Sequence, residues 1–361
     1  AGPRRRRCKP KALFGFLCAA DKVSRSVKLT YEAGTDRLYL ETSTPALWTA
    51  VAMEAKAKGH QGFEVAVPAK QARNMANLNR DDFTRTQLGV DQDGFWIGQH
   101  CLQHSVPDFL PRPVVHRWEA RAAMPAWYCE EIVNRVIGSL PTDPTKENLN
   151  GVLLDFKEEG CTVVGTDGNR MHLLQLPQLK VDGRSGRLPP SVFLSDQFFR
   201  YLKLVANREW TALSISESQI LGRGEDYQAI TKAVMKGEAG PISGWEKASA
   251  TYDHYVMADR KDVLRILALS SGDWVSLKYD GGSSLTIGYP DADDKEVRET
   301  IGVRSVGKQR FSLSLSKTYC KEAIEAVRGG LVRIGARDSS SQVTFQGEDD
   351  LFKAIVMPLR R

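Results

Sequence analysis

The sequence predicts an α+β protein of three similar domains, each with two helices packed on antiparallel sheets. Two observations predict this class: a strand–helix segment occurs three times, and hairpin-like pairs of strands lie on both sides of each copy. The length agrees, because 361 residues exceed what one hydrophobic core usually serves. Domains of roughly 100 to 150 residues are the expectation for such a chain.

The three strand–helix segments share one pattern. Each has a short strand of alternating apolar residues, then Pro or Ser where a helix cap would lie, then about three turns of amphipathic helix. The segments are 63–78, 190–205 and 310–327. Since they lie about one domain length apart, they indicate a repeat of whole domains.

Hairpin patterns flank each segment, with apolar and polar residues alternating around a turn rich in Gly, Asp or Glu. This alternation is typical of antiparallel strands with one buried face. The pairs before the segments are 26–43, 150–167 and 274–290, and those after them are 84–99, 211–224 and 330–346. A further helix opens each domain, at 11–23, 125–139 and 258–271. We therefore expect two helices and about eight strands per domain.

Two stretches rich in turn-forming residues separate the domains. Residues 107–115 contain three prolines, and residues 237–244 are rich in glycine. The predicted domains are 1–117, 118–245 and 246–361.

Positive charge is unevenly distributed along the chain. The formal net charge is +6, but residues 1–28 hold nine Lys and Arg against Asp21 alone, so the rest of the chain is net acidic. The Arg4–Arg7 run suits either a phosphate-binding arm or a solvated terminus. Elsewhere, contact with nucleic acid requires a local arrangement of cations.

The predicted helices of every domain offer such an arrangement. Taken singly, each cation suits a solubilising role, but helices that all faced one centre would bring the cations to duplex phosphates. No base-reading motif or aromatic interleaving accompanies them, so the contact would not depend on sequence. The residues expected to face DNA are Lys22, Arg25, Lys70, Arg73, Arg135, Arg200, Lys203, Arg260, Lys261, Arg265, Lys317 and Lys321.

Three motifs stand in order along the chain. VPAK (67–70) forms a strand–helix junction, an LNG strand leads to a TDG turn within 148–177, and IVMPLRR spans 355–361. Together they resemble the bacterial DNA sliding clamps, the beta subunit of DNA polymerase III, and the chain is identified as a divergent member of that family. The resemblance covers nearly the whole chain and is weakest in residues 1–25.

The resemblance implies a DNA clamp fold that closes as a head-to-tail homodimeric ring. Such a ring encircles double-stranded DNA and acts as a processivity factor for the replicative DNA polymerase. We therefore expect a cytoplasmic, nucleoid-associated protein. Strand 96–103 and the stretch 264–277 are the expected sides of the dimer interface, with Leu102 and Leu269 as apolar anchors.

The family also binds short linear motifs of polymerases and the clamp loader in a pocket between its second and third domains. Methionines suit this role, because they are flexible and polarizable. A plain edge strand is the alternative for the tail. The pocket residues implied by the resemblance are Leu149, Thr166, Gly168, Arg170, Met171, Pro241, Tyr319, Ile355, Met357, Pro358, Leu359 and Arg360.

The chain departs from the family near this pocket. Glu147 and Asn148 stand where the family often has aromatic residues, and Trp245 and Glu246 stand where a basic and an aliphatic residue are expected. These changes predict an altered motif preference.

The sequence argues against an enzyme. His100 and His104 have metal-type spacing, but the surrounding alternation indicates a strand with no third ligand nearby. Adjacent acidic pairs such as Glu130–Glu131 point apart, and no nucleophile or phosphate-loop motif occurs. We expect no catalytic residue, metal or cofactor. The alternative function is a clamp-fold scaffold that binds partner motifs without encircling DNA.

Overall fold

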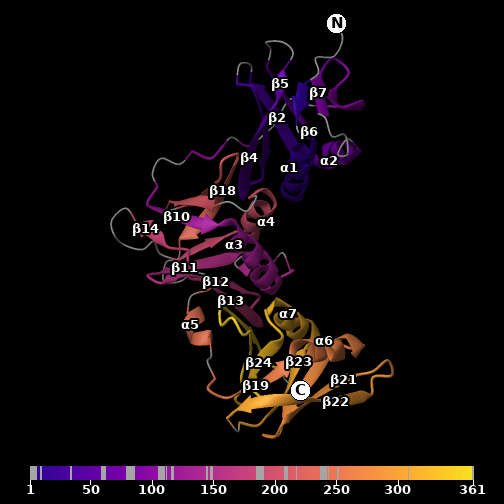
Figure 1. The fold of residues 1–361 in the computed structure, drawn as a ribbon, viewed down its shortest axis with the longest axis vertical. Helices are drawn as coiled ribbons and strands as arrows, with labels where there is room; N and C mark the ends of the chain where they lie inside the picture. The colour runs from indigo at the N-terminus through magenta and orange to yellow at the C-terminus, as the bar shows by residue number, and fades with distance from the viewer. Residues whose placement is uncertain are drawn as a thin grey trace. The chain divides into compact units, whose positions relative to one another are not determined.

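The structure, a computed structural model, describes most of the chain (Figure 1). The described residues are 6–8, 10–32, 35–57, 62–78, 86–104, 110, 112–114, 118–143, 145–146, 149–183, 191–206, 210–216, 218–235, 242, 244–249, 252–307 and 309–359. Among the residues singled out above, Arg4, Arg5, Glu147, Asn148, Pro241 and Arg360 lie outside these ranges.

The elements recur in one order three times. Repeat 1 contains β1 (Arg6–Cys8), α1 (Pro10–Val23), β2 (Ser26–Glu32), β3 (Arg37–Ser43), β4 (Leu47–Glu54), β5 (Lys56–Ala57), β6 (Phe63–Pro68), α2 (Ala69–Leu78), β7 (Thr86–Val90), β8 (Phe95–Ile97) and β9 (His100–Leu102). Repeat 2 contains β10 (Ala120–Pro125), α3 (Ala126–Glu131), a π-helical turn (Ile132–Val136), a 3-10 turn (Ile137–Ser139), β11 (Val152–Lys157), β12 (Gly160–Thr166), β13 (Arg170–Leu176), β14 (Val181–Gly183), β15 (Val192–Leu194), α4 (Asp196–Val205), β16 (Trp210–Ile215), β17 (Gln219–Arg223) and β18 (Tyr227–Met235).

A short linking helix, α5 (Trp245–Ala248), precedes repeat 3. That repeat contains β19 (Tyr255–Asp259), α6 (Arg260–Leu269), β20 (Trp274–Tyr279), β21 (Ser284–Pro290), β22 (Glu296–Val306), β23 (Phe311–Ser316), α7 (Lys317–Ala326), β24 (Leu331–Gly335), β25 (Val343–Gln346) and β26 (Phe352–Val356). The predicted strand–helix segments and opening helices are all confirmed.

Strand pairing repeats as well. In one sheet of each repeat the first strand lies between two others: β1 between β5 and β7, β10 between β14 and β16, and β19 between β22 and β24. In the other sheet, β2 pairs with β3 and β6, β11 with β12 and β15, and β20 with β21 and β23. Every pair with a defined register is antiparallel, which confirms the α+β class and the threefold repeat.

Polar side chains start the helices at equivalent places. Ser195 accepts a hydrogen bond from the Gln197 amide at the start of α4, and Ser316 accepts one from Tyr319 at the start of α7. Asp259 does the same for Lys261 and Asp262 in α6. Because the first amides of a helix have no intrahelical acceptor, these oxygens fix where each helix begins.

The chain divides into two compact units, which split the middle repeat between them. Unit 1 contains residues 1–130, 181–189 and 194–234, and unit 2 contains the remaining ranges 131–180, 190–193 and 235–361. Within unit 1 the β4 strand of repeat 1 pairs with β18 of repeat 2, and within unit 2 the β13 strand of repeat 2 pairs with β26 of repeat 3. The domain boundaries near 117 and 245 stay a prediction.

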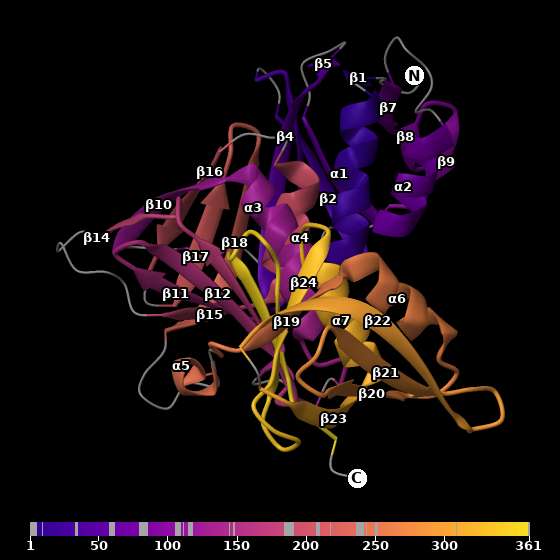
Figure 2. The ribbon, with the colours of Figure 1, turned by 60° about the horizontal axis from the view of Figure 1, so that its bottom comes forward.

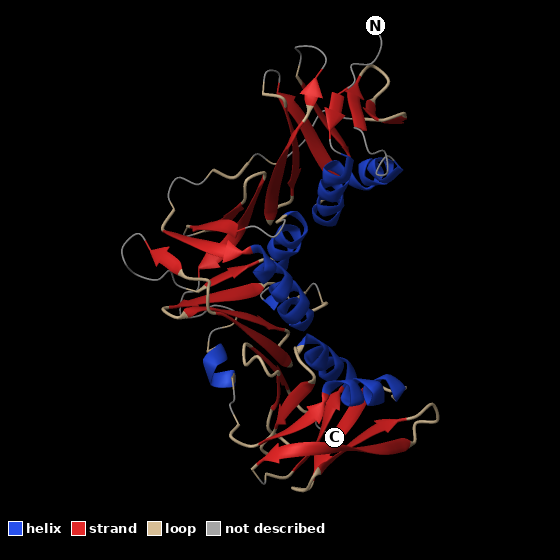
Figure 3. Ribbon diagram, in the orientation of Figure 1, coloured by secondary structure: helices blue, strands red, loops and turns tan. Residues whose placement is uncertain are grey.

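Within each unit the helices of the repeats gather on one side of the sheets, whereas the short linking helix α5 lies apart from them (Figure 3). In repeat 1, Leu13 and Leu17 of α1 and Ala72 of α2 are buried against the strands. In repeat 3, α6 and α7 lie side by side over the strands (Figure 2). Their outward faces are therefore left for polar side chains. Within the described ranges, no helix is long and apolar enough to span a membrane.

Candidate partner-binding and DNA-facing sites

The residues expected to form the motif pocket lie where β13 meets β26. In this antiparallel pair, Met171 lies opposite Ile355, and Arg170 lies opposite Val356. After β26 the tail stays attached by its backbone, because the Met357 amide donates to the Asn169 carbonyl at 2.9 Å. The Leu359 amide likewise donates to the Ser314 carbonyl at 2.8 Å. The β13–β26 pairing therefore brings two segments nearly 200 residues apart in the chain into one surface.

An apolar cluster forms the floor of this surface. Leu149 and Met171 are partly buried against it, and Ile355 is fully within it. The cluster also contains Ile242 and Trp245, which the sequence analysis did not place in the pocket. The sequence marked Trp245 only as a departure from the family, although the large apolar ring of this residue, the first of α5, was the signal that it fills a core.

The turn that leads into β13 is held by its own side chains. The Thr166 hydroxyl donates to the Arg170 carbonyl at 2.5 Å and accepts from the Gly168 amide at 3.1 Å. The Asp167 carboxylate accepts from the amides of Asn169 and Arg170 at 2.9 and 3.0 Å. Gly168 has a φ of +95°, a conformation that other residues rarely adopt. The TDG motif is thus the structural support of the pocket.

The Arg170 side chain contacts several residues beside the expected pocket. Its side chain is buried, and its Nε donates to Asp167 at 3.0 Å. Its guanidinium also pairs with Glu322 and lies 4.3 Å from the centre of the Tyr319 ring. Burial, followed by the nearby Asp167 carboxylate, raises the pKa of Tyr319, so its phenol stays neutral. Arg170 therefore positions other residues more than it offers a free charge.

Two expected pocket residues present apolar side chains at the surface. Met357 is 44% exposed and Leu359 is 40% exposed, whereas Ile355 beside them is buried. Pro358 is half-buried between them. An apolar floor with exposed apolar edges is the usual composition of a peptide-binding surface.

Most of the expected DNA-facing cations are exposed on helices or at helix ends. They include members from all three repeats, and three of them pair with carboxylates: Arg200 with Asp196, Arg265 with Glu299, and Lys321 with Glu325. These pairs are on the surface and contribute little stability. The exposed members are Lys22, Arg25, Lys70, Arg200, Lys203, Lys261, Arg265 and Lys321.

Arg135 is a correction to the expected set, because its side chain is only 4% exposed. It pairs with Glu131 at 3.2 Å and with Asp349 at 2.9 Å, and its Nε donates to the Ala326 carbonyl at 2.9 Å. Its own carbonyl accepts from the buried imidazole of His172, whose pKa burial lowers to about 4. Arg135 is a structural cation within unit 2.

Three more expected cations are half-buried and bound within the protein. Arg73 pairs with Asp21, and the Lys317 ammonium donates to the Ser270 carbonyl. Arg260 donates to the carbonyls of Ile324 and Glu325 in the last turn of α7. Such contacts tie helix ends together, so these residues offer less surface charge than expected.

The two expected interface anchors differ. Leu102 is 4% exposed and belongs to the core of repeat 1, so its assignment as an apolar anchor on the surface was wrong. It ends β9, which contacts α2, and its side chain joins the same cluster as Leu13, Leu17 and Ala72. Leu269, at the end of α6, is 53% exposed.

Neither the models of known families nor the sequences of curated proteins match this chain. Solved structures match it over its full length. DNA polymerase III subunit beta from Pseudomonas aeruginosa is 16% identical with a TM-score of 0.81, over 99% of this chain and 100% of that chain. The sliding clamp from Bacillus subtilis (14%, TM-score 0.82) and the DNA polymerase III beta subunit from Thermotoga maritima (15%, TM-score 0.83) match over 100% of both chains. The chain therefore has the fold of the bacterial DNA polymerase sliding clamps.

Proposed function

We propose that this protein is a sliding clamp that encircles duplex DNA without sequence specificity and tethers polymerases through the β13–β26 pocket. The observation that carries the proposal is the set of exposed cations on helices of all three repeats, in a chain whose remainder beyond residue 28 is net acidic. Such a distribution favours phosphate contact without base reading. The proposal includes no catalytic role and no cofactor.

The joins between repeats support a scheme by which two copies would close a ring. Three consecutive strands follow the opening helix of each repeat, namely β2–β3–β4 in repeat 1 and β11–β12–β13 in repeat 2. In both joins, the third of these strands pairs with the last strand of the next repeat: β4 pairs with β18, and β13 pairs with β26. The same backbone hydrogen bond recurs beside both pairs. Ala52 donates to the Asp226 carbonyl at 2.8 Å, and Gln175 donates to the Leu351 carbonyl at 2.7 Å.

Repeat 3 has the equivalent strand, β22, and Thr300 is its equivalent donor. The equivalence follows from the register: the third residue of the preceding strand lies opposite Ala52 in β4, opposite Gln175 in β13 and opposite Thr300 in β22. The described strands include no partner for this edge of β22 at Thr300, and they give β9, the last strand of repeat 1, only β8. We infer that β22 of one copy pairs with β9 of a second copy, which yields a head-to-tail homodimer with two identical junctions.

The helices follow the same rule. Helix α1 of repeat 1 contacts α4 of repeat 2, and the π-helical turn of repeat 2 contacts α7 of repeat 3. In each of these contacts, the opening helix of one repeat meets the second helix of the next repeat. The equivalent contact at the proposed junction joins α6 of one copy to α2 of the second copy. Leu269 at the end of α6 and Leu78 at the end of α2 are 53% and 69% exposed, so each has apolar surface to bury there.

DNA contact by the helices predicts a change in salt dependence. Lys203→Glu combined with Arg265→Glu should weaken binding to a duplex and reduce the slope of log K against log salt. Each lost phosphate contact removes about 0.9, so the slope should fall by about 2 if the two residues of one copy contact DNA and by about 4 if those of both copies do. Fluorescence anisotropy at several salt concentrations measures both quantities. The matched control is Lys278→Glu with Lys295→Glu, which makes the same charge change at exposed positions off the helices. Equal slopes for the two double variants would show that the helix cations only solubilise.

Retention on circular DNA separates the clamp from a scaffold that binds motifs only. A closed ring loaded onto a nicked circle should stay bound and be released when the circle is cut, because only a topological link depends on circularity. A scaffold should show the same weak retention on both forms.

The proposed pocket leads to a further prediction, which concerns the affinity for a peptide. The C. crescentus clamp, 16% identical to this chain with a TM-score of 0.81, binds a polyethylene glycol molecule at a region named for tethering beta motifs. We expect Met357→Ala with Leu359→Ala to weaken binding of a short peptide ending in Leu-Phe by roughly 30-fold or more, since two apolar contacts are lost. Isothermal titration calorimetry measures the change. The control Leu204→Ala removes a similarly exposed leucine on α4 and should leave the peptide affinity unchanged.

A further inference from the structure

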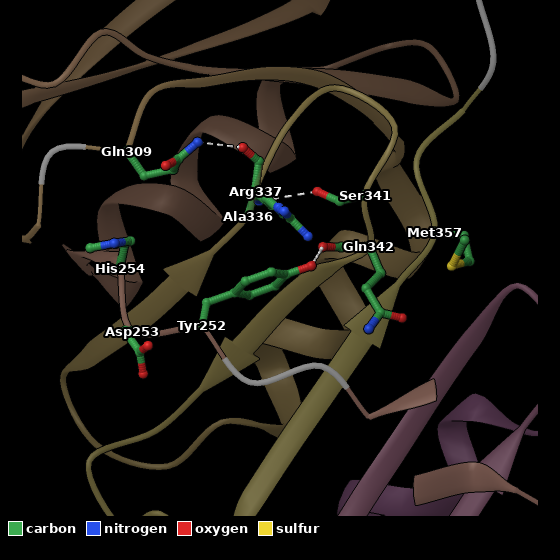
Figure 4. Close-up of a pocket in the computed structure, with 9 residues that line it drawn as sticks. All are labelled: Tyr252, Asp253, His254, Gln309, Ala336, Arg337, Ser341, Gln342 and Met357. Carbon is green, nitrogen blue, oxygen red and sulfur yellow. Dashed lines mark hydrogen bonds between the residues drawn. The ribbon is translucent and has the colours of Figure 1, made fainter. Parts of the chain in front are cut away.

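A cavity of about 670 Å³ lies in repeat 3, and its lining includes Tyr252, Arg337 and Met357 (Figure 4). Met357 is also an expected residue of the motif pocket, so this cavity adjoins a surface that already has a proposed role. An exposed tryptophan without such a role lies elsewhere, on α3 of repeat 2. Trp127 is 48% exposed there, and none of the sites described above contains it.

Trp127 occupies a position that carries a cation in repeat 3. It is the second residue of α3, which follows directly after β10, and Lys261 is the second residue of α6, which follows directly after β19. Lys261 is one of the exposed cations expected to face DNA. The repeat therefore puts the indole of Trp127 on the side of the sheets where the helices gather (Figure 3).

The outward face of α3 carries this ring and no cation. Trp127 and Glu130 are the exposed residues of the helix, and residues three positions apart lie on one helical face. A phosphate backbone is repelled by the Glu130 carboxylate, so it is disfavoured along this face. An uncharged base is not repelled, and the indole offers it a large apolar surface.

The Trp127 ring is supported by its neighbour in the chain. The buried Tyr128 ring packs against it in a T-shaped arrangement, with the ring centres 4.2 Å apart. A supported ring loses little freedom when a ligand stacks on it. The other large apolar residues exposed on the described helices are leucines, namely Leu78, Leu204 and Leu269. Trp127 thus departs from the expectation that no aromatic residues are interleaved with the helix cations.

The neighbouring helix supplies cations for phosphates. Figures 1 and 2 both show α4 beside α3, and Trp127 and α4 belong to the same compact unit. Helix α4 exposes Arg200 and Lys203. Asp196 pairs with Arg200, but the Arg200 side chain remains 51% exposed. An aromatic ring beside cations is the usual composition of a surface that binds single strands, because bases stack on the ring while the backbone follows the positive charge.

We propose, on the basis of the proposed DNA-facing role of the helices, that Trp127 stacks on an unpaired base and that α3 and α4 bind a single-stranded DNA segment. The phosphates of the segment lie along Arg200 and Lys203. In a duplex both faces of each base are already stacked on neighbouring bases, so the indole gains this contact only if the duplex opens. The protein therefore distinguishes the single-stranded part of a primed template from its duplex part.

Binding of labelled oligonucleotides to the full-length protein tests this role. The probes are an oligo-dT strand and a duplex of the same length, and fluorescence anisotropy measures both affinities. Trp127→Ala should weaken binding of the single strand by about tenfold and leave the duplex affinity unchanged. The salt dependence should stay the same, because the lost contact is not ionic. Trp127→Phe keeps an aromatic ring and should retain most of the affinity for the single strand.

Trp210→Ala is the matched control, since Trp210 is 58% exposed but lies on the other face of its sheet. Gly222 lies opposite Leu213 in the register, and a Cβ on Gly222 would meet Phe198 of α4, so this face is the one that α4 covers. Trp210 is three positions from Leu213 along β16 and therefore points to the opposite face. Its loss should change neither affinity.

Thermal unfolding of both alanine variants should match that of the wild-type protein, because both side chains are exposed. An equal loss of both affinities in Trp127→Ala, or an unchanged affinity for the single strand, would overturn the stacking role and leave the proposed clamp intact. The same holds if the wild-type protein binds the duplex but not the single strand. If it binds neither probe, the DNA-facing role of the helices and the stacking role are both wrong.

Discussion

Thr300→Pro is expected to convert the proposed dimer into monomers at concentrations where the wild-type protein is dimeric. The Val303 amide donates to the Ser283 carbonyl of the β21 side at 2.8 Å. Because backbone groups alternate along an antiparallel strand, the Thr300 amide points to the opposite, open edge. Ala52 and Gln175 use the equivalent amides to join repeats within the chain. Proline removes this donor without removing a bond between β21 and β22.

The expected effect is large because the proposed ring has two junctions. An unmade hydrogen bond at a buried contact costs about 1–3 kcal/mol, so two junctions should raise the dimer dissociation constant by at least roughly 30-fold. Sedimentation velocity over a concentration series measures it. Thr300→Ala keeps the amide and loses only the exposed hydroxyl contact with Thr286, so it should remain dimeric.

A monomeric Thr300→Pro protein should still bind the Leu-Phe peptide, since both strands of the proposed β13–β26 pocket belong to one chain. It should also lose retention on circular DNA, because an open monomer cannot form a topological link. A proline variant as dimeric as the wild-type protein would contradict the β22–β9 junction and leave the fold unaffected.

Arg135→Met is expected to lower the free energy of unfolding by about 3–5 kcal/mol, because removing one partner of a buried ion pair leaves charge without compensation. The Glu131 carboxylate would keep Arg328, but Asp349 would lose its pairing with Arg135. The Ala326 carbonyl would lose its donor, and the Phe352 ring would lose the cation that lies 4.6 Å from its centre. Thermal unfolding should show a Tm lower by roughly 6–20 °C.

Arg200→Met is a closely matched control. Arg200 also lies on a helix and pairs with an acidic residue four positions earlier, but its side chain is 51% exposed. Its loss should change stability by no more than about 0.5 kcal/mol. DNA affinity should show the opposite order: Arg200→Met should lower it and Arg135→Met should not, since only Arg200 presents its charge to solvent. Equal destabilisation by both substitutions would contradict the structural role given to Arg135.

The elements of this fold were readable from the sequence because they depend on local patterns. Alternating apolar residues predicted the hairpins, and the polar residues Ser195 and Ser316 predicted where α4 and α7 begin. The recurrence of one pattern three times predicted the repeat, and the structure confirms the same pairing scheme in each copy. Much of the pocket surface came from the family resemblance of the TDG and IVMPLRR motifs.

The surroundings of particular side chains were not readable, because periodicity shows which residues share a face but not what covers that face. Arg135 was expected on an open helix surface. The Asp349 carboxylate and the Phe352 ring cover it from more than 200 residues away in the chain. Leu102 was expected at a surface edge, but the helices of repeat 1 pack over its side of β9. Trp245 was read as a departure near the pocket, and packing made it part of the floor.

Residue types at short spacing were enough to predict the elements, their threefold order, and the concentration of cations on helices. Which of those cations reach solvent, which strand edges remain open, and where a cavity forms beside Met357 depended on tertiary packing. Those properties arise where segments distant in the chain pack together, and burial there depends on partners that no local pattern specifies.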